Sequence, residues 1–245
     1  MKITLNEFLE ANKKFNEYSE KNKFNKSFEV ITGSIPILIS APHSVRQIRN
    51  GKIKEKDAYT GPIAIELQKQ TNCYCIYKTK NNNDDANYDI KDNKYKEEIL
   101  KIITQNKIEL LLDIHGASDI HGFGVDIATG EGKNINQNKK LVITLKETLE
   151  KHDIKNVEID KIFKANSIHT ICKTISETAN IPCIELEISR TYRDIKNFNE
   201  IKKVIEGLRE YIIKISNTDN VTSTKKSIAL KWYLKSKNYL SKIKQ

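Results

Sequence analysis

The chain has 245 residues and a formal net charge of +10. This length is enough for one large domain with a substantial core. No segment approaches the roughly 18 consecutive apolar residues of a membrane-spanning helix, so an integral membrane protein is not expected. Residues 1–7 contain no apolar signal core and include an early acid, which predicts a mature, cytoplasmic protein.

The positive charge is spread along the whole chain rather than gathered in one patch. The lysines stand among many Asn and Ile residues, without an arginine-rich run or a ladder of aromatic residues among basic ones. This pattern indicates a general compositional bias, so we do not expect a nucleic-acid partner. The cysteines fit no zinc ribbon or redox motif, and we predict reduced core thiols at Cys73, Cys75, Cys172 and Cys183.

Hydrophobic periodicity and turn residues divide the chain into strands separated by helices. The predicted helices span residues 4–22, 60–70, 94–106, 135–151, 167–179 and 195–215. The predicted strands span residues 28–32, 35–40, 72–78, 108–114, 123–129, 156–159 and 182–188. Residues 44–56 are expected to be irregular, and residues 80–93, rich in Asn and Asp, are expected to form a loop that buries little.

This alternation predicts an α/β fold with three layers, in which helices flank a mixed β-sheet. Gly33 and Ser34 are expected to turn the first strand into the second as an antiparallel hairpin, which would make the sheet mixed.

We assign residues 1–216 to one catalytic domain. Residues 217–245 are expected to form a polar linker and a basic helix that packs on this domain. The helix would carry seven lysines and no acid.

Three predicted strands each bring a metal-competent side chain to their carboxyl end. His43 follows a strand that breaks at Pro42, His115 ends a second strand, and Glu187 ends a third. Ligands of such sheets bind at the carboxyl ends of the strands, so these side chains are expected to converge. Asp113, on the same face as His115, can orient its imidazole. Two imidazoles and one carboxylate are the ligand set of catalytic zinc, with an open position for water.

Asp57 is the expected third metal ligand. Many zinc hydrolases have an acid three residues after the first histidine, but that position here is Arg46. The next acids are Glu55 and Asp57. Asp57 stands just before a predicted helix, where its carboxylate can turn back toward the strand ends. The alternative is that Asp57 only stabilises the helix N-terminus.

Glu185 and Glu187 share one face of a predicted strand among apolar residues. Burying carboxylates is costly unless they bind a metal or form hydrogen bonds, so one of them should face the site. Burial would raise its pKa toward neutrality, which suits a general base that later donates the proton. We assign Glu187, which lies closer to the strand end, as the base. Glu185, like Asp113, is assigned a supporting role, and it could pair with a lysine deeper in the protein.

Three arginines are candidates for binding an acidic substrate, because this chain otherwise uses lysine almost everywhere: Arg49, Arg190 and Arg193. The planar guanidinium can hold a carboxylate through two hydrogen bonds. The alternative for each is a surface ion pair.

An ordered set of short motifs over residues 28–215 resembles the N-formylglutamate amidohydrolase-like family. The motifs are Ala41-Pro42-His43-Ser44, Arg49-x-Gly51-x-x-Lys54, Asp57-x-x-Thr60-Gly61, Asp85-Ala86-Asn87-Tyr88, Leu112-Asp113-Ile114-His115-Gly116 and Glu185-Leu186-Glu187-Ile188-Ser189-Arg190.

The resemblance implies a zinc-dependent amidohydrolase with the mixed-sheet fold of zinc carboxypeptidases. It implies His43, Asp57 and His115 as metal ligands and Glu187 as the catalytic glutamate. Members that hydrolyse formylglutamate tend to have arginine where this chain has Tyr88.

We therefore expect a Zn²⁺ enzyme that cleaves the C–N amide bond of a small acidic N-acyl amino acid such as N-formylglutamate. Glu187 and Arg190 are assigned to catalysis, and Arg49, Asn87 and Arg193 to substrate binding. One rival hypothesis is a metallo-carboxypeptidase or amidase acting on peptides or γ-glutamyl bonds. The other is a basic, non-catalytic binding module. The sequence leaves the oligomeric state open.

Overall fold

The computed structural model of this chain describes residues 3–15, 27–89 and 93–217. The α-helices there are α1 (Leu5–Asn12), α2 (Thr60–Thr71), α3 (Lys94–Asn106), α4 (Lys139–Lys151), α5 (Ile171–Ala179) and α6 (Phe198–Ser216). Short 3-10 helices are η1 (Lys13–Phe15), η2 (Asp119–His121), η3 (Arg190–Tyr192) and η4 (Ile195–Asn197).

The strands form a seven-stranded sheet and a separate two-stranded hairpin. The strands of the large sheet are β1 (Phe28–Ile31), β2 (Ile35–Ala41), β5 (Cys73–Lys78), β6 (Leu110–Ala117), β7 (Val125–Ala128), β8 (Val157–Ile159) and β9 (Cys183–Ser189). Their spatial order is β1-β5-β2-β6-β9-β7-β8. The hairpin consists of β3 (Gln47–Arg49) and β4 (Lys52–Lys54).

The predicted mixed α/β sheet is confirmed, but the predicted hairpin between the first two strands is wrong. β5, β2, β6 and β9 run parallel, whereas β1 and β7 pair antiparallel with β5 and β9. β5 lies between β1 and β2, so the antiparallel partner of β1 is β5. The turn at Gly33 therefore carries the chain past the position of β5, not into an adjacent strand.

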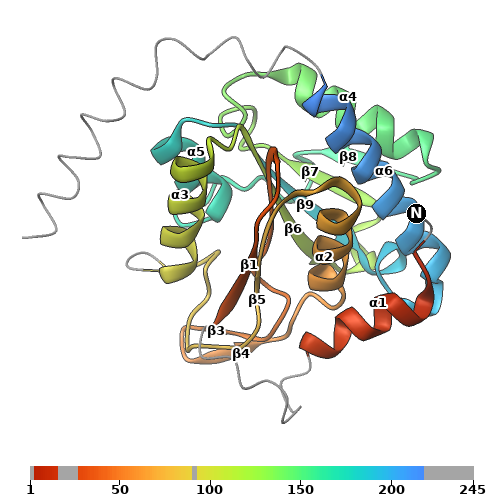
Figure 1. The fold of residues 1–245 in the computed structure, drawn as a ribbon, viewed down its shortest axis with the longest axis horizontal. Coiled ribbons are helices and arrows are strands. Elements are labelled where there is room, and N and C mark those ends of the chain that lie inside the picture. The colour runs from red at the N-terminus through yellow and green to blue at the C-terminus, as the bar shows by residue number, and fades with distance from the viewer. Residues whose placement is uncertain (1–2, 16–26, 90–92, 218–245) are drawn as a thin grey trace, which may run out of the picture.

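Helices cover both faces of the sheet, as Figure 1 shows, with α3 and α5 on one side and α2, α4 and α6 on the other. Successive side chains of β2 point to opposite faces of the sheet, and each face packs against one layer of helices. Ile37, Ile39 and Ala41 pack in the cluster of α2, α4 and α6, and Leu38 packs in the cluster of α3 and α5. Ser40 also faces the second layer, where its hydroxyl is 3.0 Å from the Tyr95 hydroxyl. Polar side chains on this face are thus buried beneath helices.

Residues 47–54, expected to be irregular, form the β3–β4 hairpin. Asn50 and Gly51 make its two-residue turn, and both have positive φ angles of 52° and 72°. An Asn-Gly pair is the residue combination that a type I′ hairpin turn favours. The strands are only three residues long and have one apolar residue each, which is why periodicity did not reveal them.

The other sequence predictions can be placed as well. All four cysteines are free and buried, as expected. The predicted helix at 4–22 has its first part in α1, which a capping box between Thr4 and Glu7 begins. Its end, at residues 16–22, lies outside the described residues, as does the basic helix expected after residue 217.

No helix in the described ranges has both the length and the apolar character needed to cross a membrane.

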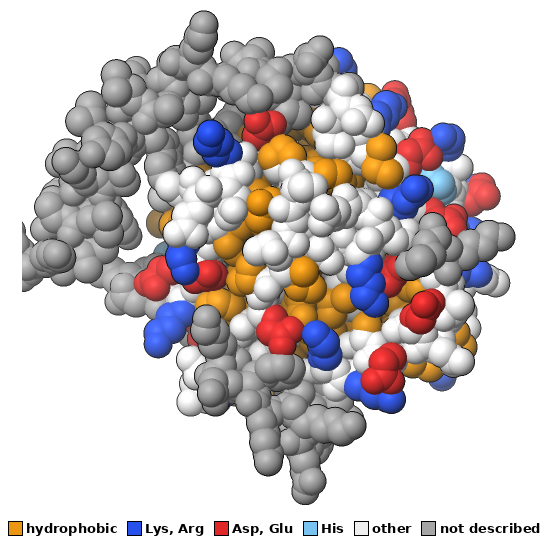
Figure 2. Space-filling view, viewed as in Figure 1, with side chains coloured by type: hydrophobic (Ala, Val, Ile, Leu, Met, Phe, Trp, Pro, Cys, Tyr) orange, Lys and Arg blue, Asp and Glu red, His pale blue; other side chains and the backbone are white. Residues whose placement is uncertain are grey.

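Acidic and basic side chains are interspersed over the described part of the face drawn in Figure 2. On that face the lysines and arginines lie next to Asp and Glu side chains instead of forming one continuous basic area. This arrangement agrees with the interpretation of the net charge as a compositional bias.

Candidate metal centre

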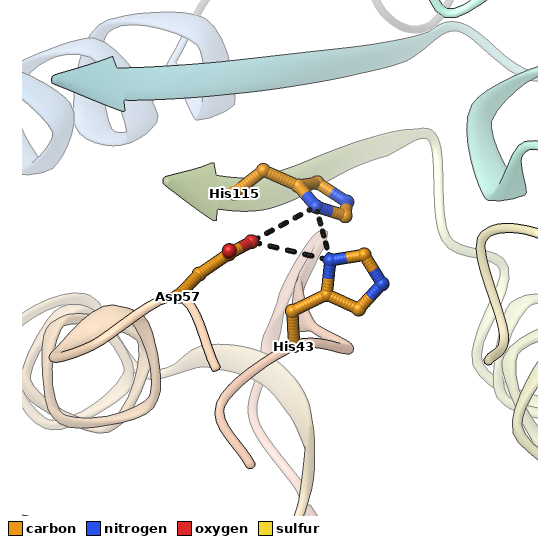
Figure 3. Close-up of side chains that lie close together, drawn as sticks. All are labelled: His43, Asp57 and His115. Carbon is orange, nitrogen blue, oxygen red and sulfur yellow. Dashed lines mark hydrogen bonds and ion pairs between the residues drawn. The ribbon is translucent and has the colours of Figure 1, made fainter. Parts of the chain in front are cut away.

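The side chains of His43, Asp57 and His115 meet at the carboxyl end of the parallel strands and point toward one another (Figure 3). His43 Nδ1 lies 3.2 Å from Asp57 Oδ2, and His115 Nδ1 lies 3.4 Å from the same oxygen. The two Nδ1 atoms are 3.1 Å apart. We call these three residues the triad.

The triad has the spacing of three ligands around one metal ion. In tetrahedral coordination with bonds of about 2.0–2.1 Å, ligand atoms are separated by about 3.3 Å. The distances of 3.1, 3.2 and 3.4 Å match that edge. All three side chains are buried, so the donor atoms are withdrawn from bulk water. A His/Asp/His metal-binding arrangement is therefore present.

Adjacent strands position the two histidines. His43 stands two residues after the end of β2, and His115 lies in β6, which pairs with β2 in parallel register from Ile37 to Ser40. Asp57 comes from the loop before α2, and its backbone N–H donates to the His43 carbonyl at 2.9 Å. Tyr59 then turns the chain into α2 with a left-handed φ of 70°. For a bulky residue this conformation is strained, and it occurs here directly beside the site.

A buried carboxylate holds the outer nitrogen of each histidine. His43 Nε2 is 2.8 Å from Asp85 Oδ1, and His115 Nε2 is 3.0 Å from Asp113 Oδ2. A proton on each Nε2 leaves the Nδ1 lone pair free for a metal, and the hydrogen bond fixes the ring orientation. Asp113 thus lies beside the His115 imidazole, as the sequence analysis expected.

Asp85 is a site residue that the sequence assignment missed. It lies in the loop at 80–93, which was expected to bury little, yet Asp85 and Ala86 are fully buried. The Arg49 guanidinium binds Asp85 Oδ2 through Nε at 2.9 Å and Nη2 at 2.7 Å. Arg49 therefore supports the carboxylate that orients His43. The Asp85-Ala86-Asn87-Tyr88 motif was the available signal.

Asp85→Asn is expected to weaken metal binding about 10–100-fold, the usual cost of removing a carboxylate behind a ligating histidine. The asparagine keeps the size of the side chain but removes the charge that holds the His43 N–H. Competition with a chromogenic chelator measures the affinity. Asp153→Asn makes the same charge change at a side chain that is 72% exposed and serves as the control. Equal affinities for the two variants would contradict the assignment.

The electrostatics of the triad favour a bound cation. Burial alone would raise the pKa of Asp57, but hydrogen bonds with His115 and His43 outweigh burial and hold this pKa well below its usual range. Burial opposes charge on His115, yet the Asp113 carboxylate raises the pKa of this imidazole well above its usual value. The surrounding carboxylates thus stabilise positive charge at the centre.

Glu187 lies beside the triad on the same face of the sheet. It is the register partner of His115 on the neighbouring strand β9, as Glu185 is of Asp113. Burial outweighs the charges of His115 and Lys54, which lower the pKa of Glu187, and raises this pKa to about 8. Burial likewise raises the pKa of Glu185, whose Oε2 is 3.4 Å from the Asn87 amide nitrogen. A buried glutamate with a pKa near neutrality therefore stands next to the candidate metal.

The Arg193 guanidinium ties the ends of β6 and β9 to the loop before α2. It donates to the carbonyls of Ile188, Ala58 and Ala117 at 3.0, 2.9 and 3.1 Å, and the residue is only 8% exposed. A Cβ at Gly116 would come within 2.4 Å of this guanidinium, so glycine makes room for it.

Arg190, assigned to catalysis, and Asn87, assigned to substrate binding, are engaged in contacts within the protein. Arg190 is exposed, and its Nε binds Asp194 at 3.1 Å. Asn87 accepts from the Ile171 N–H at 2.7 Å and so links the loop at 80–93 to α5.

Comparisons with known proteins identify the fold as one used by hydrolases. No protein-family model matches the chain, and no curated protein matches its sequence. Among solved structures, a gene product from Agrobacterium tumefaciens has 12% identity and a TM-score of 0.57, over 83% of this chain and 97% of that one.

Two further structures have named activities. N-formylglutamate amidohydrolase from Ralstonia eutropha has 9% identity and a TM-score of 0.50, over 77% of this chain and 98% of that one. A bacteriophage poly-γ-glutamate hydrolase has 12% identity and a TM-score of 0.50, over 79% and 91%. The fold implied by the family resemblance is therefore confirmed.

Proposed function

We propose that this protein is a zinc-dependent amidohydrolase that cleaves the C–N amide bond of a small acidic N-acyl amino acid such as N-formylglutamate. The observation that carries the proposal is the triad, whose three donor atoms lie 3.1–3.4 Å apart with a buried carboxylate behind each imidazole. Glu187 beside it supplies the acid–base group that amide hydrolysis needs.

Zinc fits the donor set. Two imidazole nitrogens and one carboxylate oxygen are typical zinc ligands, whereas magnesium and calcium prefer oxygen alone. Three protein ligands leave a fourth position open, as in catalytic rather than structural zinc sites. When bound, the ion would lower the pKa of a coordinated water to about 7 and polarise the amide carbonyl.

Glu187 would move the protons of the reaction. Its carboxylate accepts a proton from the attacking water and then donates that proton to the leaving amine nitrogen. A nearby dication lowers the pKa of the glutamate, so part of the population is ionised near neutral pH. Arg193, which was expected to bind the substrate, would instead act as a positioning residue, because its guanidinium is bound to three backbone carbonyls.

The names of two proteins that share the fold support an acidic substrate. One is an N-formylglutamate amidohydrolase and the other a poly-γ-glutamate hydrolase, so both names specify a glutamate-derived substrate. A small N-acyl glutamate would suit a centre in which every ligand is buried.

Purified protein is expected to contain about one zinc per chain and to hydrolyse N-formylglutamate. Elemental analysis gives the stoichiometry, and a screen of formyl-, acetyl- and γ-glutamyl-glutamates gives the preferred bond. Less than about half an equivalent of metal, with none recovered on adding zinc, would refute the metal centre. A preference for γ-glutamyl peptides would move the assignment to the peptidase hypothesis while leaving the metal centre intact.

A further inference from the structure

Lys54 brings a positive charge to the triad that the sequence assignment did not include. Its Nζ lies 2.9 Å from His43 Nδ1 and 3.9 Å from Asp57 Oδ1. The side chain is 34% exposed, whereas those of both histidines are at most 2% exposed. Lys54 thus reaches from solvent to the atoms that would hold the metal.

The hairpin that carries Lys54 is fixed to the loop that carries Asp85. The Ile48 N–H donates to the Asp84 carbonyl at 3.3 Å, and Arg49 binds Asp85. Asn50 Nδ2 donates to the Tyr88 hydroxyl at 2.7 Å. The Arg49 guanidinium also lies 4.7 Å from the centre of the Tyr88 ring. Lys54 is therefore placed by a set of specific contacts and is more than an unattached surface lysine.

The three arginines expected to hold a substrate carboxylate are engaged elsewhere. Arg49 binds Asp85, Arg193 binds backbone carbonyls, and Arg190 binds Asp194 at the surface. Tyr88 contacts the turn of the Lys54 hairpin. The same loop–hairpin contact that uses Tyr88 thus fixes the position of Lys54.

A buried hydrogen-bond acceptor stands opposite Lys54. Gln47 is its register partner in the hairpin, so the two side chains lie on one face with Cβ atoms about 5 Å apart. Gln47 is fully buried, and its Oε1 has no hydrogen-bond partner among the described residues. A cation beside an unsatisfied acceptor suits a ligand in which a carboxylate adjoins an N–H group, as it does in an N-acyl amino acid.

We propose that Lys54 binds the carboxylate of the substrate and so selects acidic N-acyl amino acids. A bound dication would repel the ammonium from His43 Nδ1, and the four-carbon stem lets it turn toward an incoming anion. The recognition is by a point charge rather than by the two-pronged fork of an arginine. This inference rests on the proposed function, because it names the substrate group that the same site binds.

Lys54→Met is expected to raise KM for N-formylglutamate roughly 10–100-fold with little change in kcat, since it removes one charge-assisted hydrogen bond made equally in the ground and transition states. N-formylglutamine lacks the side-chain carboxylate, and the α-amide of N-formylglutamate lacks the α-carboxylate. The increase in KM should disappear for the analogue that lacks the carboxylate bound by Lys54. Lys52→Met, on the exposed part of the same hairpin, is the control.

Calorimetry of glutamate binding to zinc-loaded protein gives a second readout that does not depend on turnover. Wild-type turnover tests the proposed function, whereas the ratio between Lys54→Met and wild type tests this inference. Four results would overturn the inference: unchanged KM and glutamate affinity, an equal penalty for all three substrates, a loss confined to kcat, or a variant that no longer retains zinc. The third would place Lys54 at the reacting carbonyl.

Discussion

Glu187→Gln is expected to lower kcat by about 10²–10⁴-fold while the protein keeps its zinc, because that is the usual contribution of a positioned acid–base group. Glutamine preserves the size of the side chain but can neither accept the proton of the attacking water nor return it to the amine. Steady-state kinetics and elemental analysis on the same preparation measure both quantities.

Glu185→Gln is the matched control for this variant. Glu185 lies two residues earlier on the same face of β9 and contacts Asn87. We expect it to lose much less activity, since its register partner is Asp113 and not the ligand His115. Full turnover in Glu187→Gln together with loss in Glu185→Gln would transfer the acid–base role to Glu185.

The pH dependence of stability tests the environment of Glu187 separately from catalysis. With a pKa of about 8 against the ordinary 4.5, folded metal-free protein retains a proton that the unfolded chain releases. The free energy of unfolding should therefore fall as pH rises from about 4.5 to about 8 and then level off. Urea denaturation of metal-free wild type and Glu187→Gln across this range isolates the residue, because the other groups titrate in both. Identical slopes would contradict the raised pKa.

The chain order of the strands and helices could be predicted because each element has a local signal. The runs at β2, β6 and β9 are apolar, and Asn93 caps α3 at the expected boundary. Such patterns do not encode which strands pair. β1 and β5 are separated by more than 40 residues, and only packing across the sheet brings β5 between β1 and β2.

Within the site, the strand-end histidines could be located because a strand fixes where its last residues point. Asp85 and Lys54 could not be, because each depends on a non-local contact. Asp85 is buried because it contacts His43, which lies 42 residues earlier in the chain. Lys54 reaches the triad only through the β3–β4 hairpin, although its Asn50-Gly51 turn was visible in the sequence.

His43→Ala is expected to reduce zinc affinity about 10²–10³-fold, and it distinguishes two candidate ligand groups. His43, Asp57 and His115 form one group, and Asp113, His115 and Glu185 form the other. His115 belongs to both, so its replacement cannot separate them. If structural zinc binds with roughly 10–16 kcal/mol through four ligands, each ligand carries about 2.5–4 kcal/mol, which gives the expected factor.

We expect the first group to bind the metal because of the spacing of its donor atoms. Its donor atoms lie 3.1–3.4 Å apart, and each imidazole uses the nitrogen that its carboxylate partner leaves free. In the second group, the Nε2 atom of the shared His115 already binds Asp113. Chelator competition on His43→Ala and Glu185→Gln, with the half-buried His169, which belongs to neither group, replaced by alanine as a control, measures the difference. Tight binding by His43→Ala and weak binding by Glu185→Gln would assign the metal to the second group. Because Lys54 contacts His43 and Asp57, which belong only to the first group, such a result would also separate the metal from Lys54.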